Sequence, residues 1–130
     1  MAYTGEGIDI SLAAAEDLSD YQYCFVHLAS DTTVDLMDGG TEFPVGILQN
    51  APESGETAVV RVTGISKLKM NASISVGSKI KAEYVGASDN GKGDAADTDY
   101  DNVRAIALTA AGAENDVITV LLTTDTLMVS

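Results

Sequence analysis

Apolar residues along this chain fall into short runs separated by turn-rich gaps, and within most runs apolar and polar residues alternate. Alternation with a period of two is typical of β-strands with one buried face. The segments Asp38-Gly39-Gly40 and Pro52-Glu53-Ser54-Gly55 are strong turns between runs. The pattern predicts an all-β fold, a small single-domain β-barrel or β-sandwich. We expect strands over residues 21–28, 34–37, 43–48, 57–63, 65–70, 79–85, 103–109 and 117–124, with a bulge or corner at Gly64.

One arrangement of runs occurs twice, from Val45 to Thr63 and from Ala105 to Thr123. In each copy a short apolar run is followed by a turn-rich gap and a second β-patterned run. Strand pairs of this kind, with no helical pattern between them, are typical of hairpins. Two interpretations stay open: an internal duplication, which aligns Ile47 with Ile106, or two unrelated hairpins of similar composition. Both predict the same strands.

Residues 1–18 differ from the body that follows. Ile8 and Ile10 alternate with polar residues, and residues 12–18 have the composition of one weak helical turn. The stretch has too little apolar surface to hold itself in place. We therefore expect an extended N-terminal arm over residues 1–18 and a β-rich domain over residues 19–130, and an arm of this kind suggests a partner surface.

Charge is distributed unevenly along the chain. Twenty acidic and seven basic residues give a net charge of −13, which argues against binding to nucleic acid or an anionic membrane. All basic residues lie between Arg61 and Arg104, and residues 1–60 carry only acids. Two uses fit this asymmetry: pairing within one fold, or association in which an acidic face of one copy meets the basic stretch of another.

The residues that could carry chemistry do not form a catalytic set. The single cysteine, Cys24, and the single histidine, His27, are three positions apart on an expected strand and point to opposite faces, so they form no nucleophile and base pair. With one cysteine and one histidine, the chain can form neither an internal disulfide nor a structural zinc site built from cysteine and histidine. Phosphate-binding, hydrolase and metalloprotease motifs are absent from the sequence. We expect no enzymatic activity and no cofactor.

Residues 86–102 form a glycine- and aspartate-rich segment, expected to be a long exposed loop. Asp97, Asp99 and Asp101 alternate in it as calcium ligands do. Asn102 and Leu108, however, stand where a calcium-binding loop that starts at Asp97 needs glycine and glutamate. A weak calcium site and a solvated acidic loop are the two interpretations, and the mismatches favour the loop.

The N-terminal sequence lacks the basic and apolar regions of a secretory signal, and the apolar runs are too short to span a bilayer. The sequence therefore predicts synthesis in a cytoplasm, with no membrane partner.

Several short motifs follow one another in a specific order from residue 15 to residue 122. They are Ala15-Glu16-Asp17-Leu18-Ser19 with Tyr21-Gln22-Tyr23, Val45-Gly46-Ile47-Leu48-Gln49-Asn50 with Gly55-Glu56, Val62-Thr63-Gly64-Ile65, Ile74 with Gly77, and Val117-Ile118-Thr119-Val120-Leu121-Leu122. In this order and spacing the chain resembles the tailed-phage capsid decoration, or capsid cement, family of head proteins. Two features depart from the pattern: Ala105 stands where a second glycine is expected, and the 86–102 segment is long and acidic.

The resemblance implies a virion structural protein, made in the host cytoplasm, that binds the capsid exterior and stabilises the head by bridging neighbouring major capsid proteins. It also implies a homotrimer. The arm residues expected to contact the capsid by strand addition are Ala2, Tyr3, Thr4, Ile8 and Ile10. The residues expected to mediate self-association are Tyr21, Tyr23, Phe25, Lys67 and Lys69.

A carbohydrate-binding or host-surface-binding β-module of a phage tail or fibre is the alternative function. Such modules present exposed aromatic side chains to their ligands. The chain has no tryptophan and five tyrosines, so the sequence gives this alternative little support.

Overall fold

The computed structural model describes residues 7–39, 42–84, 89–97 and 102–126, and within these ranges the chain forms nine β-strands and no helix. The all-β prediction is confirmed. The described residues contain no helix capable of crossing a membrane. The strands are β1 (Gly7–Ala14), β2 (Phe25–Leu28), β3 (Thr33–Leu36), β4 (Pro44–Leu48), β5 (Thr57–Lys69), β6 (Lys79–Ala82), β7 (Gly93–Ala95), β8 (Asn102–Ala107) and β9 (Val117–Thr126).

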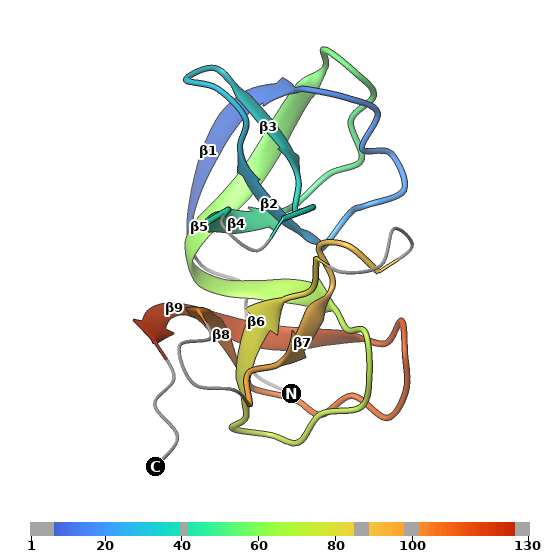
Figure 1. The fold of residues 1–130 in the computed structure, drawn as a ribbon, viewed down its shortest axis with the longest axis vertical. Coiled ribbons are helices and arrows are strands. Elements are labelled where there is room, and N and C mark those ends of the chain that lie inside the picture. Colours follow the sequence, from blue (N-terminus) through green and yellow to red (C-terminus); the bar gives the residue numbers. More distant parts are fainter. Residues whose placement is uncertain (1–6, 40–41, 85–88, 98–101, 127–130) are drawn as a thin grey trace.

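Five strands close into a small barrel in the order β1-β3-β2-β4-β5, with β5 pairing back to β1 (Figure 1). The long strand β5 then leaves the barrel and enters a second sheet, ordered β5-β9-β8-β6-β7. The change of partner occurs at Gly64, which has a φ of 95° and pairs with Gly7 of β1 on one side and Leu122 of β9 on the other. A positive φ is readily adopted only by glycine. The corner predicted at Gly64 is confirmed.

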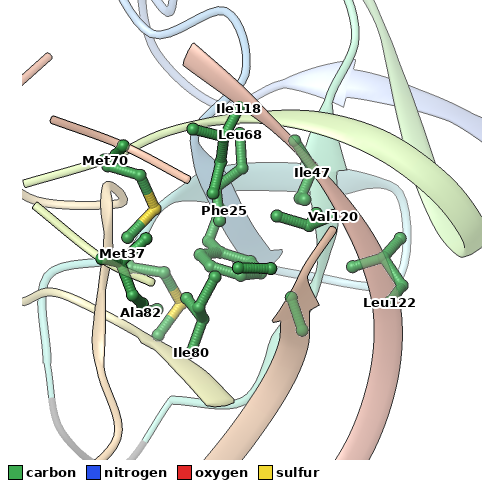
Figure 2. Close-up of a cluster of buried hydrophobic side chains, with 14 residues drawn as sticks. Phe25, Met37, Ile47, Leu68, Met70, Ile80, Ala82, Ile118, Val120 and Leu122 are labelled. Carbon is green, nitrogen blue, oxygen red and sulfur yellow. The ribbon is translucent and has the colours of Figure 1, made fainter. Parts of the chain in front are cut away.

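Two hydrophobic clusters stabilise the two halves. One cluster fills the barrel and includes Leu18, Val26, Leu48 and Val60. The other lies where the barrel meets the second sheet and is centred on Phe25, which is fully buried (Figure 2). Its members are Phe25, Met37, Ile47, Leu68, Met70, Ile74, Ile80, Ala82, Ala105, Ala107, Ala111, Ile118, Val120 and Leu122.

The described part of the expected N-terminal arm belongs to the barrel. Residues Gly7–Ala13 pair antiparallel with β5, and Ala13 and Ala14 pair parallel with β3. The alternation that begins at Ile8 continues through Leu12, which packs against the barrel cluster, and Leu18 is fully buried. The arm assignment was therefore wrong for residues 7–18, because this stretch completes the barrel and packs Ile10, Leu12 and Leu18 into its core. Residues 1–6 lie outside the described part of the chain.

The segment expected to be a long exposed loop contains β7, which pairs with β6. Its glycines allow it to pack on the core. Gly91 is buried with a φ of 82°, and a Cβ there would lie 2.5 Å from Leu36 Cδ1 and 2.9 Å from the Phe25 carbonyl oxygen. The loop prediction was wrong over residues 91–95, since composition suggested exposure whereas the glycines serve close packing.

Both copies of the repeated arrangement form antiparallel hairpins, β4 with β5 and β8 with β9. Their registers differ. Ile47 pairs with Arg61, so an equivalent register would pair Ile106 with Val120, but Ile106 pairs with Leu121. The predicted strands of both hairpins are confirmed. The registers of the two hairpins differ by one residue, so equivalent residues of the second strands, such as Arg61 and Val120, project to opposite faces relative to their partner strand.

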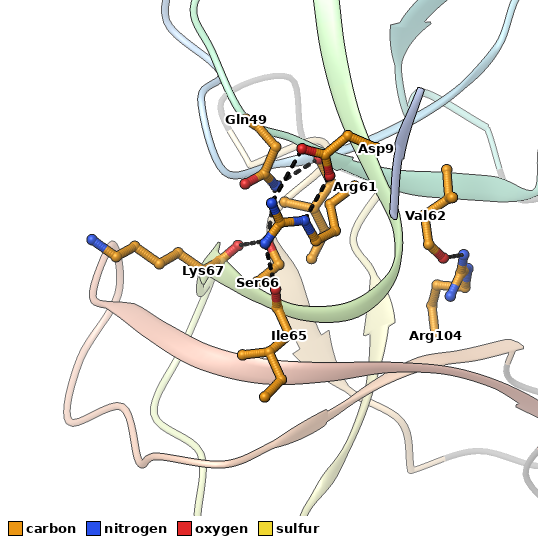
Figure 3. Close-up of polar contacts among 9 residues, drawn as sticks. Asp9, Gln49, Arg61, Val62, Ile65, Ser66, Lys67 and Arg104 are labelled. Atoms are coloured by element: carbon orange, nitrogen blue, oxygen red, sulfur yellow. Dashed lines mark hydrogen bonds and ion pairs between the residues drawn. The ribbon is translucent and has the colours of Figure 1, made fainter. Parts of the chain in front are cut away.

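Two arginines connect segments that are distant in sequence (Figure 3). Arg61 of β5 forms a bidentate ion pair with Asp9 of β1, at 2.6 and 3.1 Å. This hydrogen-bonded pairing lowers the pKa of the Asp9 carboxyl. Arg104 of β8 is buried, and its guanidinium donates to the backbone carbonyls of Pro44, Val45, Val62 and Thr123 at 2.9 to 3.0 Å. Arg104 therefore joins the barrel strands β4 and β5 to β9 in the second sheet.

Candidate interaction surface

A row of three apolar side chains crosses the outer face of the second sheet. Ile65 of β5 pairs directly with Leu121 of β9, and Leu121 pairs directly with Ile106 of β8. Their neighbours along each strand, Ser66, Val120 and Ala105, are buried. Strand alternation therefore turns Ile65, Leu121 and Ile106 outward. Leu121, at the centre of this apolar row, is 39% exposed.

Lysines border the apolar row. Lys79 of β6 pairs with Ile106, and Lys67 lies two positions beyond Ile65 on the same face. Lys69 and Lys81 occupy the next outward positions of their strands, and Lys81 pairs with Asp94 of β7. The strand residues 64–69, 79–82, 102–107 and 117–124 contain no aspartate or glutamate, and Asp94, beside Lys81, places one carboxylate at the β7 edge of this face. In a protein with a net charge of −13, this face combines an apolar centre with a basic border, and it fits a partner that is apolar with an acidic rim.

The residues predicted to mediate self-association do not lie on one surface. Phe25 was wrongly included, because its side chain is fully buried in the cluster between the barrel and the second sheet. Tyr21 packs against the barrel cluster. Tyr23 has a φ of 68° and precedes β2, and its ring centroid lies 5.7 Å from Lys67 Nζ. Lys67 and Lys69 do lie on the outer face of β5. The alternation expected over residues 21–28 holds only within β2, Phe25–Leu28.

Lys67 and Lys69 of this surface were predicted from the sequence, whereas its apolar row was not. A signal was present: residues 117–122 of β9 are apolar at nearly every position, including those that face outward. A strand with two apolar faces indicates burial on both sides or a covered outer face.

Cys24 and His27 occupy separate environments. Cys24 is buried in the barrel cluster, where burial raises the pKa of its thiol to about 11. His27 lies half-buried on β2 with its Nε2 atom 3.2 Å from a carboxylate oxygen of Glu42. The prediction that the two do not form a nucleophile and base pair agrees with this placement.

The predicted capsid-binding residues are divided by the fold. Ala2, Tyr3 and Thr4 lie outside the described residues. Ile8 is 62% exposed, whereas Ile10 packs against the barrel cluster. Because both already pair with β5, strand addition onto a partner by this stretch would have to use the opposite edge of β1.

The acidic 86–102 segment is only partly described, and its aspartates have separate roles there. Asp89 forms an ion pair with Lys92 at 2.9 Å, and a hydrogen bond from this lysine lowers the pKa of the Asp89 carboxyl. Asp94 lies in β7, and burial raises its pKa. Asp99 and Asp101 lie outside the described residues, so the predicted choice between a calcium site and a solvated loop stays a prediction.

An acidic patch, formed by Glu16, Asp17, Asp35 and Asp38, lies on the barrel, in the part of the chain that carries only acidic residues. A side-chain hydrogen bond between Glu16 and Asp35 is the main cause that raises the pKa of Glu16 to about 7, with smaller contributions from burial and from the charges of Asp35, Asp38 and Asp17. The folded protein therefore holds a proton at Glu16 under conditions in which an unfolded chain would have released it.

The raised pKa of Glu16 predicts that the stability of the fold depends on pH. Because the pKa of Glu16 is raised on folding, the folded state binds more protons between about pH 4.5 and 7, and stability should fall as the pH rises through that window. Glu16→Gln should flatten the decline, which urea unfolding at pH 5, 6 and 7.5 would measure. Glu53→Gln, which removes an exposed carboxyl from another loop, is the control and should leave the decline in place. An unchanged slope in Glu16→Gln would contradict the assignment.

Neither a family profile nor a curated protein sequence matches the chain. A solved structure does match in fold: the N base of the head fibre protein gp8.5 of bacteriophage phi29. It superimposes with a TM-score of 0.67 over 93% of this chain and 98% of that chain, at 14% sequence identity. The two share one fold. At this identity the likeness concerns the fold, and membership of the capsid decoration family stays a prediction.

Proposed function

We propose that this protein is a virion structural protein that binds the outside of a phage head. The observation that carries the proposal is the fold shared with the phi29 head fibre base, which covers nearly the whole of both chains. The ordered sequence motifs, which resemble those of capsid decoration proteins, support the same conclusion independently of the fold.

The candidate interaction surface suggests how the domain is held on the head. The apolar row, Ile65, Leu121 and Ile106, supplies area that becomes dehydrated on contact, and the lysine border orients the domain against acidic groups of the major capsid protein. A head presents many equivalent sites. A modest contact made at each of them reinforces the whole lattice, particularly where one domain bridges neighbouring capsid proteins.

The remaining surface is consistent with this role. Residues 1–60 carry only acidic charges, which keeps decorated heads soluble and mutually repulsive. No catalytic step is part of the proposal. Trimer formation, expected from the family resemblance, would place several copies of the interaction surface around one capsid axis.

Mixing the purified chain with undecorated heads tests the proposal. The heads are assembled from the major capsid protein of the phage that carries this chain, in expanded and unexpanded forms, and are imaged by electron cryomicroscopy. We expect regular density on the outer surface of expanded heads, and decorated heads should release their DNA at a higher temperature than bare ones. If the heads stay undecorated at saturating concentrations of the protein, the proposal is overturned. If the protein instead binds sugars on a glycan array, the carbohydrate-binding alternative is favoured.

A further inference from the structure

The single histidine of the chain meets two carboxylates at one edge of the barrel. The connection from β3 to β4 must cross β2, because β2 lies between these strands in the sheet. It brings Asp38 and Glu42 to His27 of β2. The donor atoms of the three side chains all lie within 4.8 Å of one another.

Glu42 is held in a defined orientation. Its Oε1 atom accepts hydrogen bonds from the backbone amides of Asp38 at 2.8 Å and Gly39 at 3.0 Å. Its Oε2 atom faces His27 Nε2 at 3.2 Å. Hydrogen bonds that fix one oxygen of a carboxylate while the other faces a ligand atom are the outer-shell arrangement found around bound metals.

The spacing of the donors fits a small tetrahedral ion. Ligand atoms about 2.0–2.2 Å from a zinc ion lie roughly 3.3 Å apart, close to the separation of His27 Nε2 and Glu42 Oε2. Asp38 is exposed, so a side-chain rotation can close the remaining gap. His27 and Glu42 also line a cavity of about 300 Å³ with Leu28, Phe43 and Val45. This cavity leaves room for a fourth ligand.

The electrostatic surroundings favour a cation. Asp38 belongs to the acidic patch described above, and its charge helps to raise the pKa of Glu16, although the hydrogen bond with Asp35 is the larger cause. Arg104 brings one cationic group near this cavity, since its guanidinium lies 5.7 Å from the ring centroid of Phe43, and it donates its hydrogen bonds to backbone carbonyls instead of to these carboxylates. A divalent ion would relieve their mutual repulsion.

We propose that His27, Asp38 and Glu42 form a binding site for a divalent transition metal of the zinc class, with water at the fourth position. One imidazole nitrogen with two carboxylates suits zinc, whereas calcium and magnesium prefer oxygen ligands alone. The site does not depend on the proposed function, because it is assigned from the geometry of the isolated domain.

The site is tested by calorimetry, in which zinc chloride is titrated into the full chain without a histidine tag. We expect saturable binding of one zinc per chain, a rise of a few degrees in melting temperature, and a much weaker response to calcium. Because His27 is the only histidine, its imidazole ¹⁵N signals report directly whether zinc binds Nε2. Cys24 does not compete, since its thiol is buried with its pKa raised to about 11.

Matched variants decide whether these residues are the ligands. His27→Gln and Asp38→Asn should each weaken zinc binding at least about tenfold. Asp20→Asn removes one exposed carboxylate that is not among the donors, and it should bind zinc as the unaltered chain does. If His27→Gln folds poorly, Asp38→Asn and the imidazole signals of the unaltered chain give the answer. The absence of saturable binding, unmoved imidazole signals, or full affinity in Asp38→Asn would overturn the proposal.

Discussion

Replacing Arg104 with methionine is expected to lower the free energy of unfolding by about 2–4 kcal/mol, because four backbone carbonyls lose a charged donor at once. Methionine fills a similar volume, so the loss reports mainly on the hydrogen bonds. A buried ion pair can often be replaced by apolar residues at little cost when both partners are removed. Here the acceptors belong to the backbone of β4, β5 and β9, and no side-chain substitution removes them.

Urea unfolding of three variants separates hydrogen bonding from charge. Arg104→Lys keeps the charge but cannot present the planar fork of donors, so it should lose nearly as much stability as Arg104→Met. Arg61→Met is the control, since the Arg61 guanidinium donates mainly to the carboxylate of Asp9 and also to the backbone carbonyl of Ile65 at 2.8 Å. It should cost less than Arg104→Met, about 1–2 kcal/mol, because the Asp9 carboxylate left behind is partly exposed to water. Equal losses at the two arginines would contradict a special role for Arg104.

The role of Arg104 also marks the limit of what the sequence could reveal. Strand positions followed from local alternation, and the corner at Gly64 followed from a glycine inside a strand pattern. The partners of Arg104 come from residues 44, 45, 62 and 123, and only the folded topology brings them together. Barrel closure by β1 was missed for the same reason, because the partners that bury Ile10 and Leu12 are distant in sequence.

The candidate sites were predictable to different degrees. Lys67 and Lys69 could be assigned to an outer face because alternation fixes the side of a strand. The apolar row depends on cross-strand register, which the sequence does not give: the aligned residues Ile47 and Ile106 pair with positions that differ by one residue between the two hairpins. The group of His27, Asp38 and Glu42 depends on a connection that crosses a strand, which no local pattern indicates.

Introducing glutamate at Leu121 is expected to weaken binding to expanded heads by about 100-fold or more, if the proposed function holds. Leu121 is the centre of the apolar row, and residues at the centre of a dehydrated contact contribute most of its binding energy. The new carboxylate would also meet acidic groups of the partner. Because Leu121 is 39% exposed and faces away from the core, stability should change by less than about 1 kcal/mol.

Val76→Glu is the matched control, because it makes the same chemical change at a side chain that is 64% exposed in the turn before β6. It should decorate heads as the unaltered chain does. Lys67→Glu should weaken binding less than Leu121→Glu and reduce its sensitivity to salt, since a rim charge acts mainly through long-range attraction. Decoration is measured by co-sedimentation with heads, and the oligomeric state of each variant by sedimentation velocity. Full decoration by Leu121→Glu would show that this surface does not face the capsid, and a change confined to the oligomeric state would assign it to self-association.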